Sequence, residues 1–243
     1  MSSLELRNPH SVLAALQTRP QDVLEIQINL SSASAAWKEV ADAAASQGVT
    51  VRQPRPQVNK PRKGGPRDGR TSLNTASVRP RDGEELKNVL RSDAPRGLWL
   101  ALDCIQDPHN VGAIFRSAAF FGVQGIVLTE DRSAPLSAVT YDVSAGGVEA
   151  VPFSLQTNLT RALSVAKESG MWVLGSSEHA EMDVAEVDRD RRWLLVIGNE
   201  EKGMRRLTTE NCDMLCTIPC QGEVTSLNAS VAAAVLMSHL VRP

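Results

Sequence analysis

The sequence predicts an α/β protein with two domains: a small α/β module, followed by a larger domain built on a parallel sheet. Three observations support this prediction. Segments with the periods of helices and strands alternate along most of the 243 residues. Residues 98–102 form a continuous apolar run, which is typical of a strand buried on both faces of a parallel sheet. Between the two regions, a stretch rich in Pro and Gly, residues 54–69, breaks all periodicity and indicates a linker.

The small module comprises residues 1–80 and includes the linker at about 52–81. A helix is expected over 11–18, capped near Asn8 with Pro9 in its first turn. Apolar and polar residues then alternate over 23–30, which predicts a strand. An Ala-rich helix over 35–46 follows, then a β-branched run at 49–51, a returning strand at 75–78 and a connecting helix over 83–90.

The larger domain covers residues 95–243 and starts with the buried strand at 98–102. Its expected elements are a helix over 110–121, a strand at 125–128, a turn-rich stretch around Pro135, a helix over 158–169, strands at 171–174 and 193–197, a helix from about 205, a strand at 214–218 and a final helix. Strands that alternate with helices imply a parallel sheet covered on both faces. We expect Asn110 to cap the helix that begins near it and Ser226 to cap the final helix.

The composition is that of an ordinary soluble globular protein, with 42% hydrophobic and 22% charged residues. No apolar run approaches the roughly 20 residues that a membrane span requires. The first ten residues lack a basic segment followed by an apolar core, so we expect no secretory signal. The four cysteines are then expected to be free thiols in a reducing cytoplasm.

Three of the cysteines, Cys212, Cys216 and Cys220, are evenly spaced, and such thiols can hold zinc or an iron–sulfur cluster. No fourth ligand has the spacing of a metal site. The segment around Cys216 also reads as a strand, whose alternation would send the side chains to different faces. We therefore expect no metal.

The charge distribution is uneven although the net charge is only -2. Residues 51–82 hold nine Lys or Arg against two Asp, so this strip carries +7 while the rest of the chain carries -9. A local basic strip is expected where a protein contacts phosphates. The alternative is a solvated linker whose charges only keep it extended.

Polar residues follow two of the predicted strands and precede the final helix. Gly198 and Glu200 come directly after the strand at 193–197, and such strand ends bind ligands in parallel sheets. Arg116 lies six residues after Asn110 and could hold a phosphate through its planar guanidinium, although a surface ion pair is the alternative. Asn228 precedes the final apolar helix, whose amino end could accept an anion.

Other familiar sites lack their signatures. His109 reads as a turn residue, and His179 with Ser226 lacks the G-x-S-x-G elbow of a hydrolase. No G-x-G-x-x-G or Walker pattern follows a strand, so the usual dinucleotide and triphosphate sites are not expected.

Three motifs together resemble one family: Asn110 with Arg116 in NVGAIFR, Gly198-Asn199-Glu200 with Gly203-Met204, and Ser226-Leu227-Asn228 in SLNAS. In this order and spacing they are similar to the SpoU/TrmH branch of the SPOUT methyltransferases, which use S-adenosylmethionine to methylate ribose 2'-hydroxyls of RNA. The connecting turns DRSAPLS and GMRRLTTENCD also look like that branch. The first domain and its linker resemble the L30e-like substrate domain of the 23S rRNA guanosine-2'-O-methyltransferases, although this linker is more basic.

The resemblance implies a deep trefoil knot in residues 95–243 and a homodimer with the active site near its interface. It also assigns two sets of residues. The cofactor would contact Gly198, Ile218 and Leu227, with Asn228 and Ser226 nearby. The catalytic set would be Asn110, Arg116, Glu200, Ser226 and Asn228.

Physical chemistry constrains the role of Arg116. Methyl transfer needs an oxygen nucleophile held in line, and a base must take its proton. The counterpart of Arg116 has been proposed as that base, but a guanidinium keeps its proton at physiological pH. We expect Arg116 instead to hold the phosphate and to stabilise the developing alkoxide, oriented by Glu200. Asn110 would hold the ribose or orient Arg116.

Three alternatives stay open at the level of sequence. The protein could methylate tRNA instead of 23S rRNA, or it could be an antibiotic-resistance rRNA methyltransferase of the same fold. It could also be a silent RNA-binding or ribosome-assembly protein. The presence of all five catalytic candidates favours an enzyme, because a protein that only binds RNA has no need of the full set.

Overall fold

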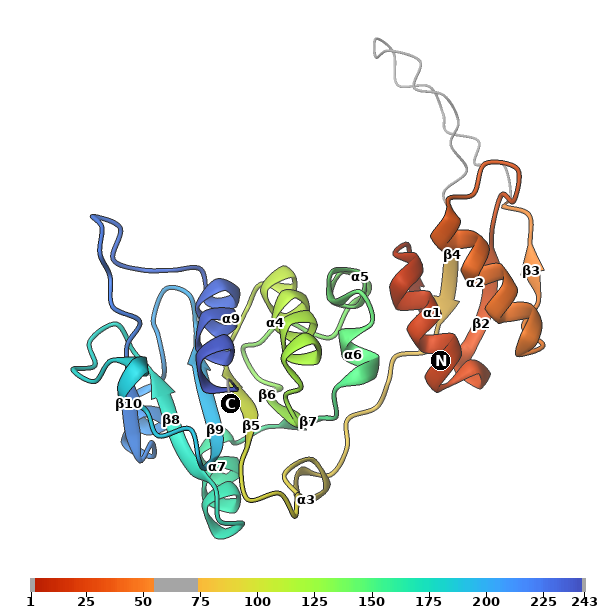
Figure 1. Cartoon of the computed structure of the whole chain (residues 1–243). Coiled ribbons are helices and arrows are strands. Elements are labelled where there is room, and N and C mark those ends of the chain that lie inside the picture. Colours follow the sequence, from red (N-terminus) through yellow and green to blue (C-terminus); the bar gives the residue numbers. More distant parts are fainter. Residues whose placement is uncertain (1–2, 55–73, 242–243) are drawn as a thin grey trace. The chain divides into compact units, whose positions relative to one another are not determined.

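The computed structural model describes residues 3–54 and 74–241. The chain divides into two compact units, Met1–Pro80 and Arg81–Pro243 (Figure 1). Each unit has its own sheet. The prediction that the larger domain is an α/β fold on a parallel sheet is confirmed.

The first unit is a mixed sheet with the strand order β1-β4-β2-β3. The strands are β1 (Leu4–Leu6), β2 (Val23–Gln27), β3 (Val51–Arg52) and β4 (Thr75–Val78), and the helices are α1 (Pro9–Thr18), α2 (Ala35–Ser46) and the short η1 (Pro20–Asp22). β4 runs antiparallel to β1 and β2, whereas β3 is parallel to β2. Asn8 caps α1 and Pro9 is its first residue, as the sequence predicted. The three-residue β1 was not expected.

Two arginines of the basic strip are tied to this unit. Arg79 Nη1 lies 3.3 Å from Asp22 Oδ1, and its carbonyl accepts a bond of 2.7 Å from Arg19 Nη1. Arg52 Nη1 lies 3.3 Å from Glu25 Oε1. Both guanidiniums are still largely exposed, with side-chain exposures of 63% for Arg52 and 43% for Arg79, so phosphate contact by the strip stays a prediction. The strip residues between 55 and 73 lie outside the described part of the chain.

The second unit is a parallel sheet with the order β10-β8-β9-β5-β6-β7. The strands are β5 (Gly97–Asp103), β6 (Gly125–Thr129), β7 (Phe153–Gln156), β8 (Trp172–Ser176), β9 (Arg192–Gly198) and β10 (Met214–Cys216). The helices are α3 (Leu86–Val89), α4 (Pro108–Phe121), α5 (Ala138–Ser144), α6 (Gly147–Ala150), α7 (Leu159–Glu168), α8 (Arg206–Glu210), α9 (Ala229–Leu240) and the short η2 (Val184–Glu186). Helices α4 and α9 lie side by side, and α7 lies across the sheet from them (Figure 1).

The central strand β5 is buried on both faces, which explains its continuous apolar run. Trp99 and Ala101 pack into a core with α7, through residues such as Leu163. The alternating residues Leu100 and Leu102 point to the opposite face and are also buried. The central strands of a doubly covered parallel sheet need apolar residues at every position.

Several local features of this unit differ from the prediction. α4 is capped by Asp107, whose side chain accepts from His109 N, and Asn110 lies within the first turn. α9 is capped by Asn228 and not by Ser226. The short helices α5 and α6 and the strand β7 were missed, because elements of seven and four residues are too short to show a clear period.

Arg81, at the start of this unit, also has a role in the fold. Its guanidinium donates to the carbonyls of Val148 at 2.8 Å and Val151 at 3.0 Å, at the end of α6, and pairs with Glu84 at 2.8 Å. Its backbone N–H donates to the hydroxyl of Tyr141. Arg81 therefore fixes the start of the second unit, and its guanidinium is committed to these partners.

No helix within residues 3–54 and 74–241 is long and apolar enough to cross a membrane.

Candidate active site

The candidate site is built at the carboxyl edge of the sheet, where β5 and β9 end together. Asp103, the last residue of β5, is in register with Gly198, the last residue of β9. The segment that leads into α4 and the turn that follows β9 therefore start side by side. The C-terminal edge of a parallel sheet is where such folds place their ligands.

A chain of side-chain hydrogen bonds joins all three sequence motifs at this edge. Asn228 Nδ2 donates to Asn110 Oδ1 at 3.0 Å. Asn110 Nδ2 donates in turn to Glu200 Oε1 at 2.7 Å. Asn199 Nδ2 lies 3.2 Å from the other carboxylate oxygen, Glu200 Oε2. Residues separated by 90 and 118 positions in sequence thus form one network.

The direction of every bond in this network is fixed from its two ends. An ionised carboxylate only accepts, so Glu200 requires the amide nitrogen of Asn110 to face it. The carbonyl oxygen of Asn110 must then face Asn228. At the other end, the backbone N–H of Ser230 only donates, and it requires the oxygen of Asn228 at 2.9 Å. The two requirements agree, so the network specifies a single arrangement of both amides.

Asn110 is the buried centre of the network. Its exposed fraction is 5%, whereas Glu200 and Asn228 are exposed. A buried amide that loses a partner is costly, so Asn110 is held firmly by its two neighbours. It therefore fixes two exposed side chains that can face a substrate.

The turn after β9 is closed tightly around Asn199, a residue that the sequence prediction did not assign. Asn199 and Gly203 exchange two backbone bonds of 3.0 and 2.9 Å, and Asn199 Oδ1 accepts from the N–H groups of Glu201 and Lys202, both at 3.1 Å. A Cβ at Gly198 would lie 2.3 Å from Met204 N, so only glycine fits there. The position of Asn199 between Gly198 and Glu200 was the one sign in the sequence that it could close this turn.

No hydrogen bond or ion pair joins Arg116 to Glu200 within the described residues, so the orientation of Arg116 by Glu200 stays a prediction. Both carboxylate oxygens of Glu200 are bonded to Asn110 and Asn199. Six residues along a helix is about 9 Å of rise and roughly 240° of rotation, which carries Arg116 to another side of α4. Arg116 is exposed and has no hydrogen-bond or ion-pair partner within the described residues. Its guanidinium is available to a ligand.

The segment before α9 contains the remaining predicted residues. Ile218 is half-buried, Leu227 is 51% exposed, and Ser226 is exposed without capping the helix. From Ile218 to Leu227, no backbone N–H donates a hydrogen bond within the described part of the chain. These amides belong to the segment that leads into Asn228 and are open to the acceptor atoms of a ligand.

The cysteines are free thiols and none belongs to the network. Burial raises the pKa of Cys212 and of Cys216 from 9.0 to about 12, so both stay protonated at neutral pH. Among the described residues there is no group of three or more His, Cys, Asp or Glu side chains that could hold a metal ion.

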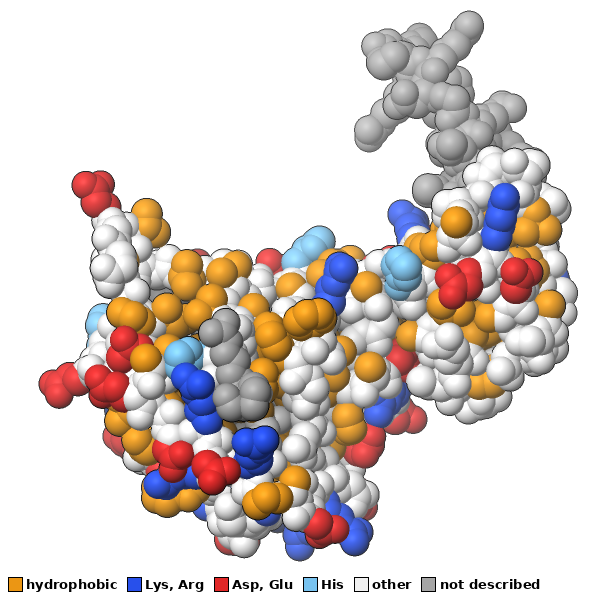
Figure 2. All heavy atoms as spheres, viewed as in Figure 1, with side chains coloured by type: hydrophobic (Ala, Val, Ile, Leu, Met, Phe, Trp, Pro, Cys, Tyr) orange, Lys and Arg blue, Asp and Glu red, His pale blue; other side chains and the backbone are white. Residues whose placement is uncertain are grey.

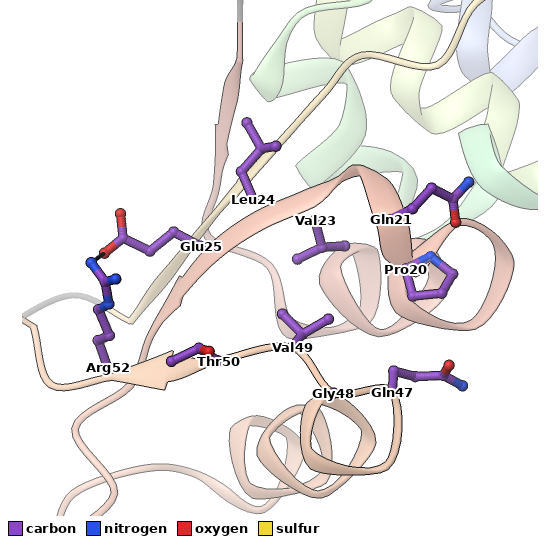
Figure 3. A pocket seen from close by; sticks show the side chains of 10 residues that line it. All are labelled: Pro20, Gln21, Val23, Leu24, Glu25, Gln47, Gly48, Val49, Thr50 and Arg52. Carbon is purple, nitrogen blue, oxygen red and sulfur yellow. Dashed lines mark hydrogen bonds and ion pairs between the residues drawn. The ribbon is translucent and has the colours of Figure 1, made fainter.

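Two pockets lie elsewhere on the described residues. One, of about 600 Å³, lies in the first unit between the start of β2 and the segment from α2 to β3. Figure 3 shows that its charged lining groups, Glu25 and Arg52, are paired with each other. The other, of about 530 Å³, is a groove along α4 and α9 lined by small and apolar residues and His239. Neither brings together the predicted catalytic residues.

Comparisons with known proteins identify the family of this chain. The family model of the SpoU rRNA Methylase family matches residues 97–238. The chain is 36% identical, over 96% of its length and 92% of the relative, to the 23S rRNA (guanosine-2'-O-)-methyltransferase RlmB of Neisseria meningitidis. It is also 36% identical to the protein of that name from Xanthomonas axonopodis pv. citri, over 96% of this chain and 94% of the relative.

Among solved structures, the SpoU methyltransferase AviRb from Streptomyces viridochromogenes, in complex with the cofactor AdoMet, has the same fold. The TM-score is 0.78 at 21% identity, over 98% of this chain and 89% of that one. The matched region contains all three motifs and the residues that form the network. The chain belongs to the SpoU rRNA methylase family.

Proposed function

We propose that this protein transfers a methyl group from S-adenosylmethionine to the ribose 2'-hydroxyl of a guanosine in 23S rRNA. The observation that carries the proposal is the network from Asn228 through Asn110 to Glu200, which joins the three motif segments in one place. Relatives at 36% identity over nearly the whole chain are named for this reaction, which supports the choice of substrate. We place the reaction in the cytoplasm, where rRNA is available.

The residues at the edge of the sheet fit the cofactor. The free amides from Ile218 to Leu227 can bind its acceptor atoms, and the close backbone approach at Gly198 keeps the facing turn narrow. Gly198, Ile218, Leu227 and Asn228 are the residues that we assign to it. When bound, S-adenosylmethionine supplies a methyl group activated by a sulfonium.

The protein's side chains have to place the ribose and to manage charge. In the transfer, the 2'-oxygen would take the methyl group as the carbon–sulfur bond of the cofactor breaks, and the hydroxyl proton would pass to a base or to solvent. We assign Arg116 to an RNA phosphate, because its guanidinium is exposed and unpaired within the described residues. Asn110 holds Glu200 and Asn228 toward the ribose, since positioning supplies much of the rate of such transfers. Ser226 lies two residues before Asn228 in the same segment.

The first unit is proposed to bind RNA. We assign residues 1–80 as an L30e-like substrate-binding domain, with the basic linker at about 52–81 contributing phosphate contacts. Of the strip, Arg52 and Arg79 each lie 3.3 Å from a carboxylate of the first unit, and Arg81 is bonded within the second unit.

We also propose a homodimer through the groove along α4 and α9. Val231 is 47% exposed and Val235 is 40% exposed on α9, and Figure 2 shows hydrophobic side chains gathered over these helices. Val235→Glu should give a monomer by light scattering, whereas Leu155→Glu, at a similarly exposed position on β7, should leave the dimer intact. A wild-type monomer would overturn this part of the proposal. The resemblance also implies a trefoil knot in residues 95–243, which an experimental structure would test.

The activity is tested with the full-length protein, labelled S-adenosylmethionine and total RNA from a strain that lacks its own 23S rRNA guanosine-2'-O-methyltransferase. We expect labelled 23S rRNA and a single methylated guanosine ribose by mass spectrometry. Label confined to tRNA would assign the protein to tRNA instead. Binding of RNA without any methyl transfer would support the silent RNA-binding alternative.

A further inference from the structure

The turn that carries Glu200 is attached at both ends to the end of β5, through Asp103 and the next residue, Cys104. At its start, Asn199 Nδ2 donates to the carbonyl of Cys104 at 3.0 Å. At its end, Arg205 donates twice to the Asp103 carboxylate, from its backbone N at 2.9 Å and from Nε at 2.7 Å. We call these contacts the β5 clamp. It holds the same segment that continues into α4 and Asn110.

Asp103 is completely buried, with an exposed fraction of 0%, whereas the Arg205 side chain is 42% exposed. A buried carboxylate requires compensation, and each oxygen of Asp103 accepts a hydrogen bond from Arg205. This arrangement ties the end of the turn to the sheet through one ion pair. The backbone N and Nε of Arg205 are therefore occupied by Asp103.

The backbone conformation of Cys104 is a second unusual feature at the end of β5. Its φ is +60°, a left-handed conformation that non-glycine residues rarely adopt. Its N–H donates to Thr129 Oγ1 at 3.0 Å, which holds the residue in that conformation, while its carbonyl meets Asn199. Next to each other at this point of the chain, the Asp103 carboxylate accepts from Arg205 at the end of the turn and the Cys104 carbonyl accepts from Asn199 at its start.

We propose that Asp103 and Arg205 are positioning residues of the active site, and that the β5 clamp sets the place of Glu200 relative to Asn110. The contact at stake is the 2.7 Å bond from Asn110 Nδ2 to Glu200 Oε1. Release of the turn at Arg205 frees the backbone that carries Glu200, and the carboxylate then leaves the position that the ribose and cofactor require. The effect on kcat rests on the proposed function, whereas the effect on the mobility of the turn rests on the contacts of Asp103 and Arg205 alone.

The chain offers a matched control, because Arg206 is the next residue and is paired with Glu210 on the surface of α8. Arg205→Ala and Arg206→Ala remove the same charge from neighbouring positions. We expect Arg205→Ala to lower kcat at saturating RNA and cofactor by about 10- to 100-fold, the range for a misplaced reacting group. Arg206→Ala should stay near wild type, and any loss of RNA affinity should be similar in both variants.

Amide hydrogen exchange of the ligand-free protein supplies a readout that needs no activity. In Arg205→Ala, the N–H of Gly203, which is bonded to the Asn199 carbonyl, should exchange faster, while the amides of β5 keep their protection. Arg205→Lys retains a cation for Asp103 and should recover part of kcat. If Arg205→Ala matches Arg206→Ala in both kcat and exchange, the β5 clamp does not position the site.

Two further outcomes are also decisive. If Arg205→Ala does not fold, Asn199→Ala tests the other end of the turn with the same two readouts, and wild-type values there would overturn the proposal. If the wild-type protein methylates no RNA, the proposed function fails, yet the exchange of Gly203 still shows whether Arg205 holds the turn.

Discussion

Asn110, in the first turn of α4, donates a hydrogen bond of 2.7 Å to Glu200, which follows β9 and lies 90 residues further along the chain. This contact connects the segments after β5 and β9, and the bond from Asn228 adds the segment before α9. The buried amide is therefore the point where the three segments of the site meet.

Replacement of Asn110 should lower kcat by more than its loss of stability alone explains. In Asn110→Ala, Asn228 and Glu200 each lose a partner, so we expect about 1–3 kcal/mol of destabilisation and a loss of roughly 100-fold in kcat. Asn158→Ala is the control, because it removes a cap from α7 away from the site and should cost about 1 kcal/mol with little change in kcat. Urea unfolding and methyl transfer measure the two effects. Normal turnover in Asn110→Ala would remove this residue from the site.

Arg116 should matter for RNA and not for folding. Because it is exposed and has no partner within the described residues, Arg116→Ala should change the free energy of unfolding by no more than about 0.5 kcal/mol. Loss of one phosphate contact should reduce the salt dependence of RNA binding by about one unit of slope. Arg116→Lys should keep the slope but lose turnover, because an ammonium cannot bind in bidentate fashion.

The matched control for Arg116 is Arg96, which is also exposed and unpaired in the described chain but lies before β5, at the opposite edge of the sheet. Arg96→Ala should leave both turnover and the salt slope close to wild type. Near-normal turnover in Arg116→Lys would exclude the bidentate contact.

A methyl group at Gly198 should disrupt the cofactor edge. The added Cβ would lie 2.3 Å from Met204 N and 2.4 Å from the Gly203 carbonyl carbon, both of them backbone atoms, so the turn must move. We expect Gly198→Ala to cost roughly 1–3 kcal/mol of stability and to weaken binding of S-adenosylmethionine in calorimetry. Gly83→Ala is the control, because its added Cβ would lie at an ordinary contact distance, 3.4 Å from Leu155 N, and Gly83 belongs to neither segment of the site. Equal behaviour of the two variants would contradict this account.

The buried thiols predict a loss of stability at alkaline pH. Burial raises the pKa of Cys212 and Cys216 to about 12 in the folded protein from the ordinary value of 9.0. Between these values the folded protein holds protons that the unfolded chain releases, so stability falls as the pH rises from about 9 toward about 12. Cys216→Ala should flatten this dependence in urea unfolding, whereas Cys220→Ala, at an exposed position, should not. An equally steep dependence in Cys216→Ala would argue against this cause.

The sequence by itself determined the parallel sheet of the larger domain and the segments that carry the site. The apolar run of β5 predicted a buried strand, because a strand covered on both faces has apolar residues at consecutive positions. The cap of α1 at Asn8 was correct for the same reason, since a cap depends on a few adjacent residues. The motifs at Asn110, Glu200 and Asn228 were found as separate stretches.

Only the tertiary structure decided how those residues are connected. It joined Glu200 to Asn110 and Asn199 by hydrogen bonds, and it made Asn228 the cap of α9 in place of Ser226. It also committed Arg81 to the carbonyls at the end of α6. The bond from Asn228 to Asn110 spans 118 positions of sequence, and the place where the strands end in the sheet sets which residues can meet. Local periodicity contains no information about that choice.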